Sequence, residues 1–541
     1  MVIHGQQAAP GGMSSRSRLT EPLRHPEQAP SGVRTRRALV LLALTLVLPG
    51  SAQLIAGSRV LARRALTVTA AAWIAVLLAV VVGLINRGLL LTLVTDPVAS
   101  LVVIVVLLVL AVGWALIWIN TLRIIRVPLL VRRLRPAVIV ALVLCLVATS
   151  GSLAYAAYLT NVARGAVGSI FSGGPAIAPV DGRYNFLLMG GDAGADRTGR
   201  RPDSLSVLSV DASTGRTAII SVPRNLQNAQ FAEGSPMRSV YPDGYNCGND
   251  CLINAINTEV TEKYKNLYPG VADPGAQATM EAVSGTLGIK VQAYVLVDMD
   301  GFAQLIDALG GIRIDAGGWV PISGAATDDS GDHEPPLGWI APGPQTLDGY
   351  HALWYGRSRE YASDYDRIAR QQCIQQAMIN QLNPATVLSK FESIANAGTK
   401  VVESNISSSQ LGSFVDLAMK GKGQPVSRLV IGPPDFPADF PTYPDFDQIH
   451  AKVQSALSAS SASPSPKAAG AGRGSAGGPA LAAPAVLAPA VLSGQAPANQ
   501  YNQTGPDGVP VNAARLDYLV KTGQSQILDA IMADNGQCKP L

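Results

Sequence analysis

Tyr184-Asn185-Phe186-Leu187-Leu188-Met189-Gly190-Gly191-Asp192 is a compact apolar run that ends in two glycines and an acid. Two β-rich runs follow at 205–210 and 217–222, and residues 211–215 join them as a hairpin turn would. The remaining elements that we expect are helices over 274–287, 300–309 and 365–382 and strands over 291–297 and 312–314. Strands and helices mix without strict alternation. This order predicts an α/β (α+β) fold in which a central mixed sheet lies between helices.

The N-terminal third of the chain predicts a membrane region. The chain has 541 residues, of which 48% are hydrophobic and only 15% charged, and the apolar excess lies in 38–158. Four apolar segments occur there, near 38–56, 67–85, 97–119 and 137–158. A spanning helix needs about 20 apolar residues, so each is a candidate span.

Arginines set the expected orientation. They gather in the N-terminal tail, in 57–66 and in 120–136, and positive loops stay on the cytoplasmic side. If the tail and 57–66 are both cytoplasmic, 38–56 cannot cross, and Pro49-Gly50 interrupts it. We therefore expect a re-entrant hairpin over 38–56 and three spans. The alternative is four spans with the N-terminus outside. Both topologies place the chain after the last span outside the cell, as a multi-pass membrane protein with an extracytoplasmic domain.

Composition divides the rest of the chain. Residues 1–37 are basic and poor in apolar side chains and are expected to be a disordered cytoplasmic tail. Residues 159–180 look like a short spacer, and 181–450 have globular composition. Residues 455–500 are almost wholly Ala, Pro, Ser and Gly, which is typical of a linker. The tail 501–541 has helical spacing but is too short for its own core, so we expect it to dock on the domain.

Four of the five cysteines lie beyond the membrane region. An even set in an oxidising compartment predicts two disulfides, and four cysteines allow three pairings. The short spacing favours Cys247 with Cys251, which leaves Cys373 for Cys538. Half of a zinc site is the alternative for the first pair, although no second Cys or His pair accompanies it.

Arginines and aspartates recur together in two distant stretches of the globular part. One contains Arg201, Asp203 and Arg224, and the other runs from Arg357 to Gln371. Guanidinium groups match phosphate oxygens two at a time. Interleaved carboxylates would repel a phosphate unless a divalent cation bridges them, so the pattern predicts a metal–pyrophosphate site. The net charge of +4 gives no case for nucleic acid, because the basic residues lie at membrane flanks and in these stretches.

Taken in order, these segments resemble the LytR–CpsA–Psr family of cell-wall ligases over roughly residues 180–390. The matching segments are Asn185–Asp192, Arg201–Ser204, Ile220–Arg224, Ile253–Ala255, Val297–Phe302 with Asp307–Gly311, and Leu347–Gly349 with Arg357–Arg359, Asp364–Arg367 and Gln371. The resemblance implies an extracytoplasmic α/β/α sandwich with an apolar groove for a lipid. It also implies a phosphotransferase that moves a glycopolymer from a polyprenyl-pyrophosphate carrier to peptidoglycan. Arabinogalactan or a related wall glycan is the donor that the composition suggests.

The resemblance also assigns roles to individual residues. Metal binding, by Mg²⁺ or Mn²⁺, falls to Asp192 and Asp203. Substrate binding falls to Arg201, Arg224, Arg357, Arg359, Arg367 and Gln371. The catalytic set is Arg201, Asp203, Arg224 and Asp364. If 355–359 is a strand, Arg357 and Arg359 share one face of it, whereas Arg367 and Gln371 share one face of a helix. The base remains open among Asp192, Asp203 and Asp364.

Three positions depart from the family pattern: Pro202, Asn225 and Leu252. They keep open an alternative function, a protein that binds or senses prenyl pyrophosphates or wall polymers without turnover. A DNA-binding regulator is disfavoured, because the basic site lies on the wrong side of the membrane.

Overall fold

The structure of the chain is a computed structural model. It describes residues 24, 26–85, 96–171, 176–192, 201–248, 250–323, 334–381, 393–394, 402–437, 439–461 and 503–541. Two compact units make up the chain. The first comprises Met1–Gly168 with Ser408–Ser413, and the second comprises Ser169–Ser407 with Phe414–Leu541. We call them the membrane unit and the globular unit.

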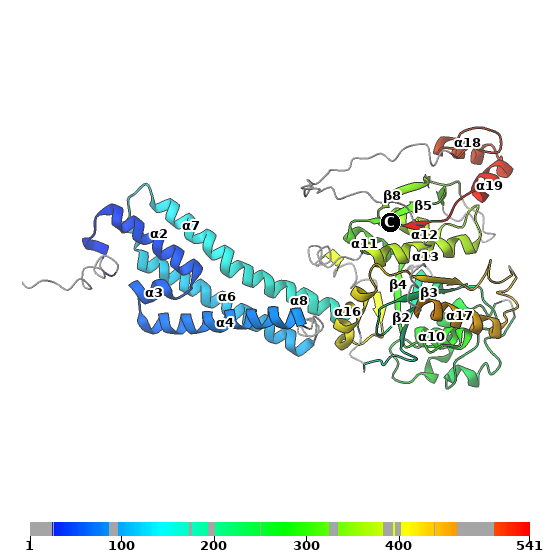
Figure 1. The fold of residues 1–541 in the computed structure, drawn as a ribbon, viewed down its shortest axis with the longest axis horizontal. Coiled ribbons are helices and arrows are strands. Elements are labelled where there is room, and N and C mark those ends of the chain that lie inside the picture. Colours follow the sequence, from blue (N-terminus) through cyan, green and yellow to red (C-terminus); the bar gives the residue numbers. More distant parts are fainter. Residues whose placement is uncertain are drawn as a thin grey trace, which may run out of the picture. The chain divides into compact units, whose positions relative to one another are not determined.

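Long apolar helices build the membrane unit (Figure 1). In chain order they are α2 (Ser31–Val47), α3 (Ser51–Ala56), α4 (Arg59–Ile85), α6 (Pro97–Ile125), α7 (Arg135–Leu146) and α8 (Ser152–Ile170). A π-helical turn, Val147–Gly151, joins α7 to α8. Three stretches are long and apolar enough to cross a membrane: Arg59–Ile85, Val98–Leu129 and Arg135–Gly168. These are the three predicted spans, each longer than the sequence pattern indicated.

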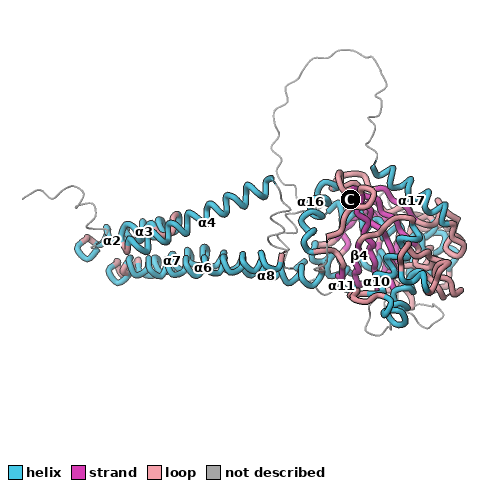
Figure 2. Tube along the Cα trace, turned by 90° about the horizontal axis from the view of Figure 1, so that it is seen from below, coloured by secondary structure: helices cyan, strands magenta, loops and turns pink. Residues whose placement is uncertain are grey.

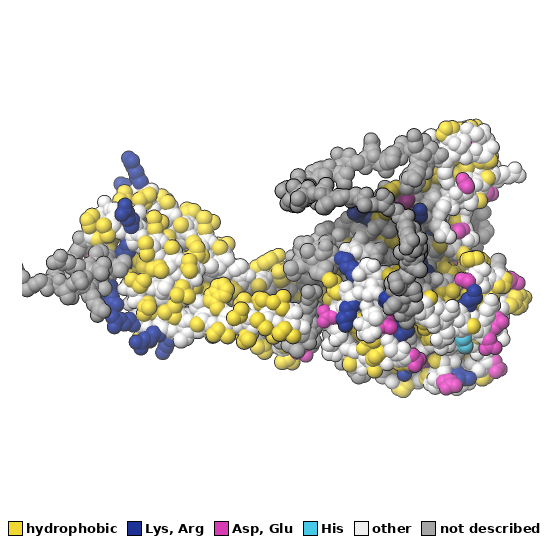
Figure 3. Space-filling model, viewed as in Figure 1, with side chains coloured by type: hydrophobic (Ala, Val, Ile, Leu, Met, Phe, Trp, Pro, Cys, Tyr) yellow, Lys and Arg dark blue, Asp and Glu magenta, His cyan; other side chains and the backbone are white. Residues whose placement is uncertain are grey.

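Arginine side chains gather at one end of this unit, and apolar side chains cover much of the rest (Figure 3). Contacts bring the chain segments at that end together. Arg34 Nη1 donates to the Leu129 carbonyl at 3.1 Å, and Arg37 Nη1 donates to the Ile124 carbonyl at 3.0 Å. The start of α2 therefore lies beside the end of α6, as expected if both face the cytoplasm.

Helices α2 and α3 form a hairpin that folds at Pro49-Gly50, where Gly50 adopts a φ of 102°. The hairpin packs on α6 through polar contacts. Thr121 Oγ1 lies 3.0 Å from Thr45 Oγ1 and accepts from Gln53 Nε2 at 2.9 Å. The shape is that of the predicted re-entrant segment, and its place relative to the bilayer stays a prediction.

A six-stranded sheet forms the centre of the globular unit (Figure 2). Its order is β10-β3-β2-β1-β4-β9, with β1 (Arg183–Asp192), β2 (Arg201–Asp211), β3 (Thr217–Val222), β4 (Ala293–Asp298), β9 (Val402–Ser404) and β10 (Ser427–Val430). The pairs β1–β4 and β3–β10 are parallel, and the other pairs are antiparallel. The predicted mixed sheet is confirmed.

Helices cover both faces of this sheet (Figure 1). One face carries α10 (Pro274–Leu287) and α17 (Phe446–Ser461), and the other carries α11 (Met299–Leu309) and α13 (Asp364–Gln381). Helix α12 (Gly349–Arg357) packs between α11 and α13, and α16 (Leu411–Gly421) places Phe414 edge-on to Phe186 of β1. The large core includes Leu187, Ile220 and Val283, each fully buried. The arrangement is the expected α/β/α sandwich.

Smaller sheets lie beside α12. Strands β5 (Ile312–Ala316), β8 (Gly343–Leu347) and β11 (Lys539–Pro540) form one, and β6 (Val320–Ile322) and β7 (Gly338–Ile340) form another. The tail helices α18 (Ala513–Lys521) and α19 (Ser525–Ala533) pack Leu516 and Leu528 around Trp319. The expected docking of the tail is therefore confirmed.

Both predicted disulfides, Cys247–Cys251 and Cys373–Cys538, are present. The second one joins the tail to α13, with a Cα–Cα distance of 6.0 Å. Helix α13 also carries Arg367 and Gln371, so the disulfide links the C-terminal tail covalently to the helix of the candidate site.

Three segment boundaries expected from composition were wrong. Helix α2 begins at Ser31, inside the supposed disordered tail, because Arg34 and Arg37 bond to main-chain carbonyls. Helix α8 continues to Ile170 in place of a spacer. Helix α17 runs to Ser461, inside the supposed linker, since Leu457 packs in the core. The rest of that linker, 462–500, lies outside the described residues.

Candidate functional site

A β-bulge presents Asp203 near the start of β2, an interior strand of the central sheet. Gly190 pairs with Ser204 and Gly191 pairs with Pro202, so Asp203 has no Cα partner on β1. Such bulges bend a strand and redirect a side chain, and they are common next to active sites. The two glycines in the opening sequence motif thus lie opposite the residue that the bulge redirects.

The Asp203 carboxylate forms an ion pair with Arg224 Nη1. Arg224 follows β3 by two residues, so the strand order brings it beside β2. The amide of Asn254 braces this turn by donating to the Arg224 carbonyl at 3.3 Å. The two side chains remain 34% and 26% exposed, so the pair is open to a ligand.

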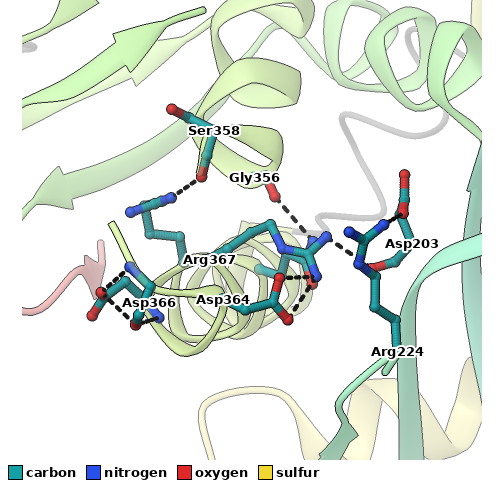
Figure 4. Close-up of polar contacts among 10 residues, drawn as sticks. Asp203, Arg224, Gly356, Ser358, Asp364, Asp366 and Arg367 are labelled. Carbon is teal, nitrogen blue, oxygen red and sulfur yellow. Dashed lines mark hydrogen bonds and ion pairs between the residues drawn. The ribbon is translucent and has the colours of Figure 1, made fainter. Parts of the chain in front are cut away.

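Arg367 reaches the same place from α13 (Figure 4). Its Nη1 donates to the Asp203 carbonyl at 2.9 Å, and its Nη2 contacts Asp364 Oδ1 at 2.9 Å. The residue is buried, and its Nε has no hydrogen-bond partner among the described atoms. Arg367 is therefore held by the main chain of Asp203 on one side and by the carboxylate of Asp364 on the other.

Electrostatics place Arg359 in the same group. Burial lowers the pKa of the Arg359 guanidinium most, and the nearby charges of Arg224 and Arg367 lower it further, while Asp203 and Asp364 oppose the shift. The guanidinium end is thus partly enclosed even though the residue as a whole is exposed. Three like charges share one small region, which is the arrangement that an anion relieves.

Side chains of α13 hold the main chain of the segment that precedes Arg359. Arg370 Nε donates to the Tyr355 carbonyl at 2.8 Å, and Arg370 Nη2 donates to the Ser358 carbonyl. Gln371 Nε2 donates to the Gly356 carbonyl at 3.0 Å. Arg367 and Gln371 do lie on one helix, but Gln371 serves the end of α12 in this structure.

The conditional prediction of a strand at 355–359 was wrong. Residues 349–357 form helix α12, whose N-cap Asp348 accepts from the His351 amide at 2.8 Å. Arg357 is the last helical residue and Arg359 lies beyond it, so the two do not share a strand face. The Arg357 guanidinium lies 5.3 Å from the centroid of the Trp354 ring.

Arg201 and Asp192 pair across the ends of β2 and β1. Arg201 is exposed. Burial raises the pKa of the nearby Tyr245 hydroxyl, which donates to Glu259, and the charge of Arg201 opposes that rise. The side chain of Asp192 lies outside what the structure describes, so its predicted metal role is untested.

The carboxylates fit a metal that takes most of its ligands from elsewhere. Among the described residues no group of three or more His, Cys, Asp or Glu is placed to hold an ion. Mg²⁺ commonly uses one or two carboxylates together with substrate phosphates and water. Asp203, half-exposed beside the arginines, is suited to be one of these ligands.

Two positioning residues were missed from the sequence. Arg370 lies three residues after Arg367, one helical turn on, but nothing in the spacing showed that it faces α12. Gln372 is buried, and its Nε2 donates to Ser221 Oγ at 2.9 Å and to the Leu429 carbonyl at 3.1 Å. It fastens α13 to the sheet across β3 and β10.

Residues 172–431 match the model of the LytR_cpsA_psr family. This part of the chain is a LytR–CpsA–Psr domain. The match includes every residue of the arginine–aspartate site described above. The resemblance inferred from the ordered motifs is confirmed.

The chain is also similar to curated proteins. The chain is 29% identical over 227 residues to "Polyisoprenyl-teichoic acid--peptidoglycan teichoic acid transferase TagV" of Bacillus subtilis, covering 41% of this chain and 50% of the relative. It is 29% identical over 247 residues to "Cell wall biosynthesis protein LcpA" of Corynebacterium glutamicum, covering 41% and 45%. It is 28% identical over 230 residues to "Biofilm regulatory protein A" of Streptococcus mutans, covering 41% and 50%.

The chain thus spans about half the length of the curated relatives it matches. Among solved structures, that of Bacillus subtilis TagV is 24% identical, with a TM-score of 0.35, and the match covers 52% of this chain and 98% of that one. The described fold of the domain rests on its own sheet order and helical layers.

Proposed function

We propose that this protein is a membrane-anchored phosphotransferase that attaches a glycopolymer, carried on polyprenyl pyrophosphate, to peptidoglycan. The observation that carries the proposal is the convergence of Arg224, Arg359 and Arg367 with Asp203 and Asp364. These residues come from β2, the turn after β3, the segment after α12 and the start of α13. Relatives named as teichoic acid transferases support the reaction class.

The reaction is a displacement at phosphorus. A peptidoglycan hydroxyl attacks the phosphorus nearer the sugar, and the bond from that phosphorus to the bridging oxygen breaks. Polyprenyl phosphate leaves with the bridging oxygen and its electron pair. Such transfers need little covalent chemistry from the protein and depend on positioning and charge neutralisation.

The guanidiniums have separate tasks in this scheme. Arg224 and Arg359 bind the pyrophosphate oxygens, and the buried guanidinium of Arg367 adds positive charge beside them while it holds Asp203 and Asp364 in place. Asp364 bonds to Arg367 with both carboxylate oxygens, at 2.9 and 3.1 Å, and orients it. The hydroxyl proton passes to one of three candidate carboxylates, Asp192, Asp203 or Asp364.

Mg²⁺, or Mn²⁺ in its place, would be held by Asp203 and Asp192 and would neutralise negative charge on the pyrophosphate. The membrane unit would anchor the protein by its three candidate spans, with the arginine-rich end in the cytoplasm and the globular unit outside. That location would put the site beside lipid-linked donors and the wall.

The test is transfer of a labelled glycan from a prenyl pyrophosphate to a peptidoglycan acceptor by the full-length protein in detergent. Transfer that requires Mg²⁺ and is lost in Arg367→Gln supports the proposal. Tight donor binding without transfer would favour the alternative, a protein that binds or senses the carrier. The name of one relative, "Biofilm regulatory protein A", is the reason for keeping that alternative.

A further inference from the structure

An open pocket of about 480 Å³ lies at the opposite end of α12 from Arg359. Its walls come from the end of α11, the β7–β8 turn and the start of α12. Pockets that bind small molecules commonly have volumes of about 300–1,000 Å³ and combine apolar walls with a few polar groups. Here the apolar wall is Trp339, and the polar groups include Asp307, Asp348 and His351.

Trp339 is held in one orientation. Its indole N–H donates to Asp517 of the C-terminal tail at 2.9 Å. Tyr361 stacks against it, with ring centroids 6.4 Å apart and an interplanar angle of 20°. An aromatic ring fixed before its ligand arrives gives up little conformational entropy on binding. The tail thus takes part in shaping this pocket.

Hydrogen-bonding groups surround the ring. His351 Nδ1 lies 2.7 Å from Asp348 Oδ1, and these side chains are 44% and 58% exposed. Asp307 Oδ1 accepts from the Gly349 amide at 2.7 Å, which fixes its carboxylate at the start of α12. The pocket therefore offers acceptors and an imidazole at set positions around an aromatic surface.

Side chains in contact lead from this pocket along α12 toward the arginines. Tyr350, 47% exposed, lies 5.4 Å from the His351 ring and 6.4 Å from the Trp354 ring. Arg357 lies over the other end, 5.3 Å from the Trp354 centroid. Nine helical residues rise about 13 Å, so the run joins the pocket to the segment that bears Arg359.

We infer that this pocket and the ring run Tyr350–Trp354 form a saccharide subsite for the neutral glycan strand of the acceptor. This inference rests on the proposed function. A pyranose ring presents a face of C–H groups that packs on an aromatic ring and an edge of hydroxyls that bond to carboxylates and imidazole. Asp307 and Asp348 repel a polyanionic chain, so a neutral strand of amino sugars fits better than a phosphate-rich donor.

The experiment measures binding of the β-1,4-linked N-acetylglucosamine tetrasaccharide to the full-length protein in detergent by titration calorimetry. Gln345 on β8 also lines the pocket. His351→Ala, Gln345→Ala and Tyr350→Ala each remove a contact to the saccharide, and we expect affinity to fall roughly fivefold or more for each. Tyr443→Ala is the matched control, because Tyr443 is a 77% exposed aromatic outside the pocket. Tyr443→Ala should bind the tetrasaccharide with the same affinity as the unaltered protein.

The tail contributes a further variant pair. Asp517→Ala should weaken tetrasaccharide binding, and Asp517→Asn should restore most of it, because the amide oxygen still accepts from Trp339. A glycerol phosphate oligomer is the anionic probe, and we expect it to bind more weakly than the tetrasaccharide at the same salt concentration. Stronger binding of the anionic probe at this pocket would overturn the assignment to the acceptor.

Failure of this inference can be told apart from failure of the proposed function. Pyrophosphate binding by His351→Ala should be normal, since the arginine cluster is intact. Donor cleavage and transfer together with no tetrasaccharide binding, or binding that the pocket variants leave unchanged, would reject the subsite alone. Tetrasaccharide binding that depends on His351 and Gln345 in a protein with no transfer would reject the enzyme and retain the subsite.

Discussion

Arg367 on α13 donates to the main-chain carbonyl of Asp203 on β2 at 2.9 Å, across 164 residues of sequence. The same guanidinium holds Asp364, while the Asp203 carboxylate holds Arg224. These contacts join α13 to the ends of β2 and β3 around the arginines. The loss of any of these charges should affect anion chemistry, and the loss of Arg367, which is buried, should also lower stability.

Arg367→Gln should lower the transfer rate by about ten- to a hundredfold, because a charge-assisted contact of about 1.5–3 kcal/mol is lost. Initial rates with saturating donor measure it. Arg216→Gln is a matched control, because Arg216 Nε bonds to Gln424 at 2.8 Å, away from the cluster. A normal rate in folded Arg367→Gln would place the chemistry elsewhere.

Arg370→Lys should reduce kcat with little change in KM. Lysine keeps the charge but cannot donate to both the Tyr355 and Ser358 carbonyls. The segment bearing Arg359 then loses its fixed position, which costs transition-state contacts more than ground-state binding. Ala377→Gly is the control, because it only destabilises α13. If it lowers kcat as much as Arg370→Lys does, the role of Arg370 is structural.

Inorganic pyrophosphate should raise the Tm of the full-length protein. Arg224, Arg359 and Arg367 repel one another, which is the reason that the pKa of Arg359 is lowered further after burial. An anion bound only by the folded state stabilises it by mass action. Arg359→Gln should keep a normal Tm without ligand but gain much less with it. Scanning calorimetry at two salt concentrations checks this, and high salt should shrink the gain.

Asp203→Asn should raise the Mg²⁺ concentration needed for half-maximal rate, because Mg²⁺ prefers carboxylate oxygens as protein ligands. We expect a rise of about tenfold or more, which corresponds to about 1.4 kcal/mol of binding free energy. The amide oxygen can still accept from Arg224, so the fold should persist. Asp366→Asn is the matched control, because Asp366 Oδ2 accepts from Ser363 at the start of α13 (Figure 4). An unchanged Mg²⁺ profile in Asp203→Asn would exclude Asp203 as a ligand.

Removing the Cys373–Cys538 bridge by a double Ser substitution should lower stability by about 2–4 kcal/mol. The bridge closes 165 residues, whereas Cys247–Cys251 closes four. Chain entropy therefore predicts a smaller loss of stability when Cys247 and Cys251 are replaced, and that variant serves as the internal comparison. Urea unfolding of both variants measures it, and a larger loss for Cys247/Cys251 would contradict the loop-length argument.

The hairpin turn between β2 and β3 provides a pH test. The pKa of Asp211 falls to about 2 despite the opposing effect of burial, because its carboxylate accepts from Ser213 and Thr214. A depressed folded-state pKa adds stability above the unfolded value, which is lost as pH falls from about 4 toward 2. Asp211→Asn should flatten the stability curve in that window, as urea midpoints at pH 2, 4 and 6 would show.

The sequence by itself determined the elements of the central sheet, the apolar spans and the residue types of the site. The runs at 184–192, 205–210 and 217–222 became β1, β2 and β3, because alternating and buried apolar residues allow little else. Helix α10 ends where Gly288, at a φ of 66°, follows Leu287. Helix caps, turns and apolar periodicity depend on residues that are close together in the sequence, so the sequence alone predicts them.

Only the tertiary structure decided which residues meet. Helix α12 ends at Arg357, so Arg357 and Arg359 do not share one strand face. A bulge of β2 against β1 turns Asp203 toward Arg224. Nothing local distinguishes Arg370, which clamps α12, from Arg367, which meets Asp203. These contacts join residues 12 to 164 positions apart, and they form because the packed sheet and α13 bring distant segments together.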